Sequence, residues 1–288
     1  MMTMNFPLRI AVTGITGRMG REIVQYILKK QRQFQQKIVL GAAIARYKSG
    51  ICGIDVGEFL RFNERIGVII TDSIELVKED FDILIDFTDP IATEEYLKFC
   101  SENSKNMVIG TTGLNVMHQN LMQNASQKIG IVYSANFSIG MTVMLKLLKE
   151  IESTIANFID IDIIETHHNK KRDIPSGTAL MIRSVLEKNI SKINSVNNIE
   201  SNAINLCSLS LLSSSALSRN IKIHSIRSGE IIGEHVVLLS RAGEYLKIIH
   251  QASNRSIFAD GAIIAAIWMS TTKIGLFNLN DVLLNPNQ

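Results

Sequence analysis

A cluster of residues that can move protons lies between Ile159 and Leu180, in the stretch IDIDIIETHHNKKRDIPSGTAL. An apolar run leads to the adjacent His167 and His168, which are followed by three basic residues within four positions. Histidine titrates near neutral pH and lysine can donate a proton, so Lys171 and the histidines suit general acid work beside a hydride transfer. The stretch is therefore our first candidate for a catalytic site.

The end of the same stretch has the composition of an anion site. Ser176, Gly177 and Thr178 open a predicted helix, so that their N–H groups and hydroxyls converge on one anion-sized space. Pro175 stiffens the turn before them, and the basic residues lie a few positions earlier. We interpret the stretch as the binding site of a small dicarboxylate substrate. The alternative is a solvated basic loop.

Two other chemistries are disfavoured at this turn. Adjacent histidines on a strand point apart, and no cysteine pair or HExxH spacing accompanies them, so no metal site is expected. A nucleophilic role for Ser176 is also disfavoured, because PSGT lacks the G-x-S-x-G elbow.

A second candidate site is the glycine-rich turn in VTGITGRMGREIV, where Gly14, Gly17 and Gly20 lie between a strand and a helix. Glycine permits positive φ and lets a phosphate approach the backbone, while a helix N-terminus offers N–H groups and partial positive charge. The spacing is a variant of the dinucleotide fingerprint, and Arg18 is positioned for the phosphates or the adenine. Tight strand-to-helix packing is the alternative interpretation.

The residues after the second strand, AAIARYKSG, indicate which nucleotide is used. An acidic residue usually binds the adenosine ribose at this place, but here Ala45 is followed by Arg46, and Lys48 comes two residues later. A guanidinium can bind a 2′-phosphate that a carboxylate would repel. We therefore predict NADPH as the cofactor, with NADH as a weaker alternative.

Two further stretches follow predicted strands and are expected at the same sheet edge. They are VIGTTG, with Gly110, Thr111 and Thr112, and YSANFSIG, with Ser134, Ala135, Asn136 and Phe137. Ligands of open α/β sheets lie beyond the carboxyl ends of strands, so backbone groups here are candidates for the nicotinamide amide. Ordinary loop residues are the alternative for each stretch.

The order of elements explains how these sites are positioned. Strand-like runs and a helix-like run alternate through the first half, which predicts a parallel sheet covered by helices. SANFSIGMTVMLKLLKEIESTI then predicts a long helix, and strand-rich sequence follows. We expect an α/β fold: a dinucleotide-binding domain (1–137), a central α+β substrate and oligomerisation domain (138–249), and a helical return to the first domain (250–288). The Ser/Leu-biased segment Asn205–Asn220 is either a loop or an irregular packed segment.

Bulk properties narrow the class of protein. The formal net charge is only +3 over 288 residues, which gives no nucleic-acid-binding tract. Three scattered cysteines, no cleavable leader and no apolar run of about 20 residues indicate a cytoplasmic protein without a membrane span.

Taken together, these motifs resemble the dihydrodipicolinate reductase family of bacterial lysine biosynthesis. The resemblance runs from about Arg9 to about Asp281. It is carried by GITGRMGREI, FDILIDFTDP, MVIGTTGL, ANFSIGMTVMLKLL, IIETHHNKKRDIPSGTAL, SIRSGEIIGEH and ASNRSIFADGAIIAAIWMS. The pairing of the His-His turn and Lys-x-Asp-x-Pro-Ser-Gly-Thr with a Gly-Arg-Met-Gly turn is the most specific part.

The resemblance implies a Rossmann fold and a reduction of 4-hydroxy-tetrahydrodipicolinate to tetrahydrodipicolinate with loss of water, in a homotetramer. It assigns His167 as proton donor or acceptor and Lys171 as the second proton donor. It assigns His168, Gly177 and Thr178 to the substrate carboxylate and Arg255 to the same pocket. It also assigns the cofactor turn to Gly14, Ile15, Thr16, Gly17, Arg18 and Met19, and GTT and SANF to the nicotinamide side.

Two departures from the family pattern affect these expectations. Many members have Glu-Arg after the second strand and use both cofactors, whereas this chain has Ala45-Arg46. A Gly- and Arg-rich loop in the central domain is replaced by the Ser/Leu segment. The rival hypotheses are another two-domain NADPH-dependent dehydrogenase, acting on aspartate or a derived carbonyl, and a non-catalytic dinucleotide sensor. The second would need neither Lys171 nor the paired histidines.

Overall fold

The computed structural model describes residues 7–33, 38–151, 160–187, 221–271 and 273–284. The chain divides into two compact units. The first comprises Met1–Ser138 with Arg255–Gln288, and the second comprises Ile139–Asn254.

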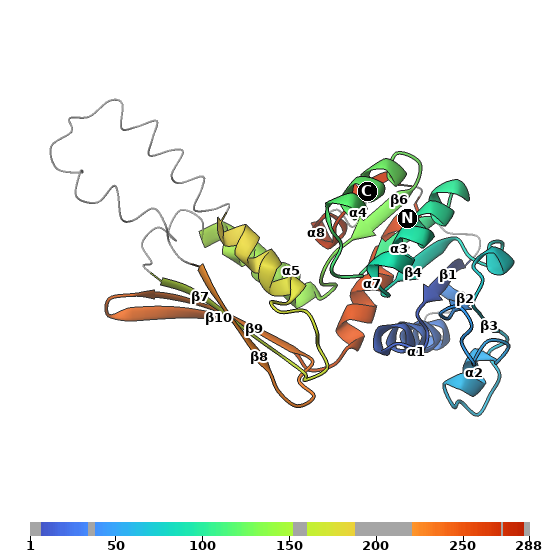
Figure 1. Cartoon of the computed structure of the whole chain (residues 1–288), viewed down its shortest axis with the longest axis horizontal. Coiled ribbons are helices and arrows are strands. Elements are labelled where there is room, and N and C mark those ends of the chain that lie inside the picture. Colours follow the sequence, from blue (N-terminus) through green and yellow to red (C-terminus); the bar gives the residue numbers. More distant parts are fainter. Residues whose placement is uncertain (1–6, 34–37, 152–159, 188–220, 272, 285–288) are drawn as a thin grey trace. The chain divides into compact units, whose positions relative to one another are not determined.

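The first unit is built on a parallel sheet, which in the described residues has seven strands in the order β11-β6-β5-β4-β1-β2-β3 (Figure 1). Every pairing in this sheet is parallel. The strands are β1 (Leu8–Thr13), β2 (Ile38–Ile44), β3 (Ile70–Thr71), β4 (Ile83–Asp86), β5 (Asn106–Ile109), β6 (Gly130–Tyr133) and β11 (Gly275–Phe277). From β1 the chain continues outward through β2, and from β4 it continues the other way. The switch in direction therefore lies between β1 and β4, where open α/β sheets bind ligands.

Helices cover both faces of this sheet (Figure 1). Alternate strand residues share a core with α1 (Arg18–Gln33), α7 (Ser256–Met269) and α8 (Leu279–Leu284) on one face. The other residues share a second core with α3 (Pro90–Glu102) and α4 (Val116–Ala125). In β4, for example, Ile83 and Ile85 belong to the first core and Leu84 to the second. Strands buried on both faces read as continuous apolar runs, which is why they were predictable.

Two short helical elements complete the described part of the first unit. They are α2 (Val56–Phe59) and the 3-10 turn η1 (Glu75–Val77). Asp89 caps the N-terminus of α3, with Pro90 in its first turn. Asn115 caps the N-terminus of α4 and forms a reciprocal capping box with His118. These caps satisfy N–H groups that have no partner within the helix.

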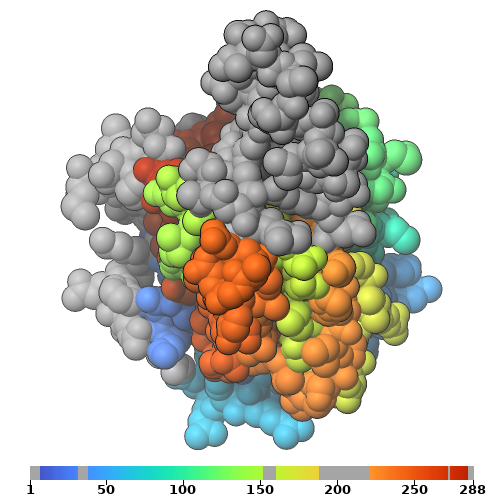
Figure 2. Space-filling model, turned by 90° about the vertical axis from the view of Figure 1, so that its left-hand side faces the viewer, coloured from blue at the N-terminus to red at the C-terminus, as the bar shows by residue number. Residues whose placement is uncertain are grey.

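The second unit is a mixed sheet, with the order β10-β9-β7-β8 among its described strands. β7 (Asp160–His167) is parallel to β8 (Ile221–Arg227) and antiparallel to β9 (Gly233–Arg241), which forms a hairpin with β10 (Glu244–Ala252). One face packs on α5 (Ile139–Glu150) and on helical residues 177–187. Figure 2 shows surface residues of β8–β10 in orange. The predicted fold class, a parallel sheet domain plus a central α+β domain, is confirmed.

Some expected boundaries differ. The long helix expected from Ser134 begins at Ile139, because Ser134–Ser138 form a turn in which Ser134 Oγ bonds to the Asn136 carbonyl. β10 continues past Ile249 to Ala252, held in register against Gly233. The Ser/Leu segment lies outside the described residues. Among the described helices, none is long and apolar enough to cross a membrane.

Candidate functional site

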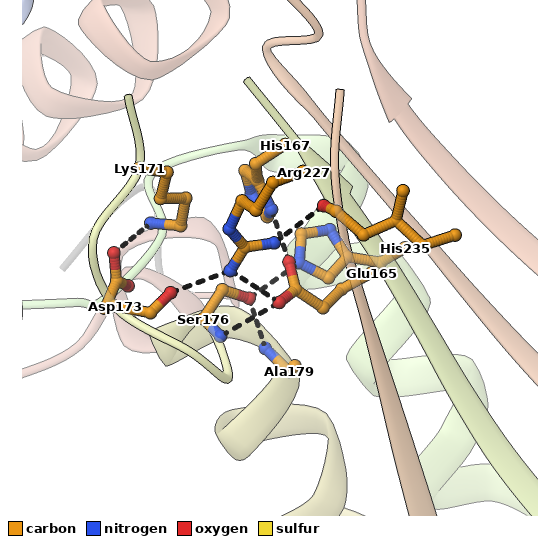
Figure 3. Close-up of polar contacts among 9 residues, drawn as sticks. Glu165, His167, Lys171, Asp173, Ser176, Ala179, Arg227 and His235 are labelled. Carbon is orange, nitrogen blue, oxygen red and sulfur yellow. Dashed lines mark hydrogen bonds and ion pairs between the residues drawn. The ribbon is translucent and has the colours of Figure 1, made fainter. Parts of the chain in front are cut away.

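The catalytic candidate His167 lies at the end of β7, beside a carboxylate from the same strand (Figure 3). Glu165 and His167 are two residues apart, so their side chains share one face of the sheet. His167 Nδ1 lies 2.5 Å from Glu165 Oε2, and both side chains are buried. The sequence contains this signal in the spacing E-T-H, but Glu165 was not predicted as a functional residue.

Arg227 joins this pair from the neighbouring strand. The parallel register of β7 and β8 puts Arg227 beside His167, and its Nη2 donates to Glu165 Oε1 at 2.8 Å and to the Asp173 carbonyl at 2.7 Å. Burial opposes ionisation of Glu165. Hydrogen bonds from Arg227, Ser225 and His167 outweigh it and lower the pKa of Glu165 to about 2. Glu165 is thus a carboxylate at neutral pH.

The state of His167 is set by opposing charges. Burial and the Lys171 ammonium lower the pKa of His167, while Glu165 raises it and so partly offsets them. The net direction is downward, which favours the neutral imidazole. A ring with these neighbours can exchange a proton with a bound substrate.

A third buried ring, His235 of β9, lies on the other side of His167. The antiparallel register puts His235 opposite Glu165, and its ring meets His167 edge-on with centroids 5.2 Å apart. His235 Nε2 lies 3.2 Å from Ser176 Oγ. Burial lowers the pKa of His235 to about 3, so this ring is neutral. The sequence motif GEH contained His235, but only the strand register brings it to the site.

Glu165, His167 and His235 each have a ligand-type atom, and these atoms lie within 4.8 Å of one another. That spacing suits a metal ion, although the sequence predicts no metal site, because its motifs place only the adjacent His167 and His168 side by side.

In this structure those atoms are already bonded, His167 to Glu165, Glu165 to Arg227, and His235 to Ser176. We therefore treat Glu165, His167 and His235 as a hydrogen-bonded cluster beside two cationic side chains. His235 joins it through the pairing of β7 with β9, which the motifs of the sequence do not reveal.

Lys171 lies in the loop that follows β7. Its Nζ is 2.8 Å from Asp173 Oδ1, and its backbone N–H donates to the His168 carbonyl. The Lys171 ammonium and the backbone N–H of Gly177 outweigh burial and lower the pKa of Asp173. Asp173 is therefore a carboxylate partner of the predicted proton donor.

Ser176 begins the helical residues 177–187. Its Oγ accepts the backbone N–H of Ala179 at 3.2 Å, and its own N–H points to Glu165 Oε1 at 3.4 Å. The side chain is buried and acts as a helix N-cap. Gly177 and Thr178 form the first turn of that helix.

The other predicted substrate residues lie in different places. His168 is buried directly after β7. Arg255 belongs to the first unit, where it immediately precedes α7 and its carbonyl accepts the Phe258 N–H. The second unit therefore brings together all the predicted substrate-site residues except Arg255.

In the first unit, the glycine turn has the geometry expected for close approach. Gly14 has φ +63°, and a Cβ there would lie 2.9 Å from Thr88 Cγ2. A Cβ at Gly20 would lie 2.2 Å from the Gly14 carbonyl oxygen, so glycine is required where α1 packs on the turn. Thr16, Gly17 and Arg18 are exposed at the start of α1, where an anion would meet backbone N–H groups.

Two residues of this turn face inward. Ile15 is buried, and its N–H donates to the Ile44 carbonyl at 3.2 Å. Met19 packs against the core. The exposed part of the turn, from Thr16 to Arg18, therefore fits a dinucleotide pyrophosphate. Ile15 and Met19 anchor the turn to the core.

The loop after β2 presents cations to solvent. Ala45 is buried, whereas Arg46 is exposed and closes a turn by accepting the Ser49 N–H. Lys48 has φ +56°, and its backbone N–H donates to Asp72 Oδ2 at 2.8 Å. Asp72 was not predicted, and it fixes the conformation of this loop.

A buried carboxylate, Asp86, joins the ends of several elements at the same edge. Its oxygens accept hydrogen bonds from four threonine hydroxyls. These come from Thr13, Thr88, Thr93 and Thr111. Burial raises the pKa of Asp86 against the effect of these bonds. Of this set, only Thr111 was a predicted site residue.

The two predicted nicotinamide-side stretches also end strands at this edge. A Cβ at Gly110 would lie 2.2 Å from the Phe87 ring, so this position requires glycine, and Thr112 follows half-buried. Ser134, Ala135 and Asn136 are half-buried in the turn after β6. Phe137 is buried, with its ring 5.4 Å from that of Phe87.

Comparison with known proteins relates both units to one family. A family model described as "Dihydrodipicolinate reductase, N-terminus" matches residues 8–137. A second, described as "Dihydrodipicolinate reductase, C-terminus", matches residues 140–283.

Whole-chain relatives agree with these matches. The curated 4-hydroxy-tetrahydrodipicolinate reductase of Blochmanniella floridana is 54% identical over 282 residues, covering 96% of this chain and 98% of that protein. The protein of the same name from Blochmanniella pennsylvanica (strain BPEN) is 52% identical over 280 residues, covering 96% of each. The solved dipicolinate-bound dihydrodipicolinate reductase from Paenisporosarcina sp. TG-14 shares the fold, with a TM-score of 0.66 at 24% identity, over 95% of this chain and 98% of that one.

Proposed function

The chain belongs to the dihydrodipicolinate reductase family and is an oxidoreductase with the 4-hydroxy-tetrahydrodipicolinate reductase activity of its relatives, and we propose that the cluster around His167 is its catalytic site. The resemblance inferred from the sequence is thereby confirmed. The product, tetrahydrodipicolinate, belongs to the diaminopimelate route to lysine. The observation that carries the proposed site is the convergence of Glu165, His167 and Lys171 at the end of β7.

The reaction requires proton management that these side chains can supply. A bound reduced nicotinamide would supply the hydride, and the substrate hydroxyl would leave as water after gaining a proton. His167 acts as proton donor or acceptor, and Lys171 acts as the second donor. The burial of His167 and the cationic neighbours support these roles, because they bring its pKa below the ordinary value and attract an anionic substrate.

The start of the helical residues 177–187 is the proposed binding site of the substrate carboxylates. His168, Gly177, Thr178 and Arg255 bind the substrate carboxylates in this proposal. Ser176 contributes by holding the helix start, since its hydroxyl is already bonded to Ala179 and lies beside His235. A helix start with basic side chains nearby favours an anion.

The cofactor site is assigned to the switch-point edge of the seven-stranded sheet. The exposed turn residues Thr16 to Arg18 hold the pyrophosphate, and the stretches after β5 and β6 bind the nicotinamide. Arg46 binds a 2′-phosphate, so NADPH is preferred over NADH. Support comes from the exposure of Arg46 and from the absence of an acidic side chain at Ala45.

The proposal extends to a cytoplasmic homotetramer. The sheet of the second unit has exposed apolar side chains on the face opposite α5, among them Ile226, Tyr245 and Ile249. The same face has side chains of both charges, Asp162 on β7 and Lys247 on β10. The molar mass in solution, measured by light scattering, tests this part.

Single substitutions test the proposed site. We expect His167→Ala and Lys171→Ala each to lower kcat by about 10²- to 10⁴-fold, the usual loss when a general acid or base is removed. The affinity for NADPH should be unchanged. The assay follows the fall in NADPH absorbance when the condensation product of aspartate semialdehyde and pyruvate is supplied.

Matched controls are available for both variants. His224 lies on the opposite face of the same sheet, bonded to Asp162, and Lys170 is 78% exposed beside Lys171. His224→Ala and Lys170→Ala should retain near-normal turnover. Near-normal turnover in both site variants would refute the proposed catalytic roles.

A further inference from the structure

The hydrogen bond between Glu165 and His167 determines which ring nitrogen is available for chemistry. Glu165 has no exposed side-chain surface, and its Oε1 is paired with Arg227 Nη2 at 2.8 Å. An ionised carboxylate only accepts hydrogen bonds. The nitrogen that faces it, Nδ1 at 2.5 Å, must therefore be the donor. In the neutral ring this leaves Nε2 with its lone pair.

The residue next to Nε2 is a glycine. Gly233, the first residue of β9, lies beside it, and a Cβ there would be 3.1 Å from Nε2 and 3.3 Å from Cδ2. A larger residue would crowd the nitrogen that Glu165 leaves unprotonated. Glu165 thus determines the protonation of Nδ1, and glycine at position 233 avoids crowding of Nε2.

The charged and titratable groups around His167 come from every element packed against it. They are Glu165 on β7, Lys171 in the following loop with its partner Asp173, Arg227 on β8, and His235 on β9 with His250 behind it on β10. Of these, only Glu165 contributes negative charge in hydrogen-bond contact with the ring. Its removal would leave the imidazolium beside Lys171, Arg227 and neutral rings, with Asp173, itself paired with Lys171, as the remaining carboxylate.

We propose that Glu165 is a positioning residue, which holds His167 with Nδ1 protonated and presents Nε2 to the substrate, while Arg227 keeps Glu165 ionised. This inference rests on the proposed role of His167. It assigns a function to a side chain that does not itself touch the reacting atoms.

The pH dependence of kcat tests this role in Glu165→Gln. The substitution keeps the shape of the side chain but removes the charge that stabilises the imidazolium. The limb of the profile that belongs to His167 should move to lower pH by about one unit, whether the ring donates or accepts the proton. The limb is identified as the one that His167→Ala abolishes. The NADPH affinity should not change.

A matched control is Glu234→Gln. Glu234 lies on β9 opposite Thr166, one residue before His235, so this substitution should leave the pH of the His167 limb unchanged. A purely structural role for Glu165 would lower kcat equally at all pH values. A Glu165→Gln profile with an unmoved limb would therefore overturn the proposal.

The ring itself can be examined without any assay. Nitrogen-15 NMR of the histidine-labelled protein, with the His167 signal assigned by its loss in His167→Ala, should show a protonated Nδ1 and an unprotonated Nε2 at high pH. The opposite tautomer would contradict the proposal. This result does not depend on turnover, so it separates a failure of the positioning role from a failure of the proposed function.

Discussion

At the scale of single residues, Ser176 has hydrogen-bond partners within the protein that the sequence does not predict. The sequence predicts Ser176 as a donor to a substrate carboxylate. In the structure its hydroxyl bonds to the Ala179 N–H and lies beside His235 Nε2. Its contribution is therefore to the position of the helix start and of a buried imidazole.

Ser176→Ala should consequently affect stability more than chemistry. Loss of the cap should lower the free energy of unfolding by about 1 kcal/mol. Urea denaturation measures this, and kcat should fall far less than in His167→Ala. Asn115→Ala, which removes the cap of α4 in the first unit, provides the comparison. A loss of kcat as large as that of His167→Ala would assign Ser176 to the chemistry instead.

The residues that sequence reasoning missed differ in whether the sequence contains a signal for them. Glu165 could have been found, since it is two positions before His167 on a predicted strand and so shares its face. Arg227 and His235 could not, because their approach depends on the register of β8 and β9 against β7. A single sequence specifies which strands exist, but it does not specify their pairing.

At the scale of elements, Asp86 connects β1, β4, β5 and α3 through hydroxyls of one residue type. The glycine turn abuts this group, since Gly14 has no room for a Cβ beside Thr88. The turns that are proposed to bind the cofactor are therefore fixed from beneath by one carboxylate. Removing it would loosen several turns together.

We expect Asp86→Ala to lower the free energy of unfolding by about 2–4 kcal/mol, because it leaves buried hydroxyls without their acceptor. NADPH should bind about tenfold more weakly, as measured by fluorescence titration. Asp82→Ala is the matched control, since Asp82 pairs with Arg9 just before β4, at the opposite end of that strand. It should lower stability without weakening NADPH binding, and equal loss of affinity in both variants would contradict the role of Asp86.

Helices and strands could be predicted where their apolar residues form a clear pattern in the sequence. The β-branched runs of β1, β2, β4 and β5 were predicted because they are buried on both faces. Helices α3 and α4 were not, since the buried residues of α3 are Thr93, Leu97 and Cys100, and only one of these is a large apolar residue. Their ends are instead defined by Asp89 and Asn115, which are common in loops as well as in caps.

At the scale of the whole molecule, two compact units divide the proposed work. The proposed cofactor residues belong to the first unit, and the residues proposed to transfer protons belong to the second. The chain returns to the first unit at Arg255, so α7 packs in the same core as β1 and α1 although it lies far along the sequence. Composition alone did not specify this return, whereas the resemblance did imply a Rossmann domain and a central domain.

The cofactor preference is a property of the molecule that one residue should control. Wild-type kcat/KM should be higher with NADPH than with NADH, and Arg46→Ala should reduce that ratio by about 10- to 100-fold, the value of a charge-assisted hydrogen bond. The exposed Arg65 of the same unit is the control, and Arg65→Ala should leave the ratio unchanged. Equal or better use of NADH by the wild-type protein would contradict the predicted preference.

The carboxylate of Asp173 has a consequence for selectivity. It lies 2.8 Å from Lys171 Nζ, so in the proposed site a substrate carboxylate competes with Asp173 for this ammonium. An exchange of one anion for another returns little Coulomb energy, and a simple monocarboxylate would gain little from it. A larger ligand also has a ring and a second carboxylate, which can make contacts that the single carboxylate of Asp173 does not make. Under the proposed function, we therefore expect Asp173 to make simple monocarboxylates poor ligands of this site.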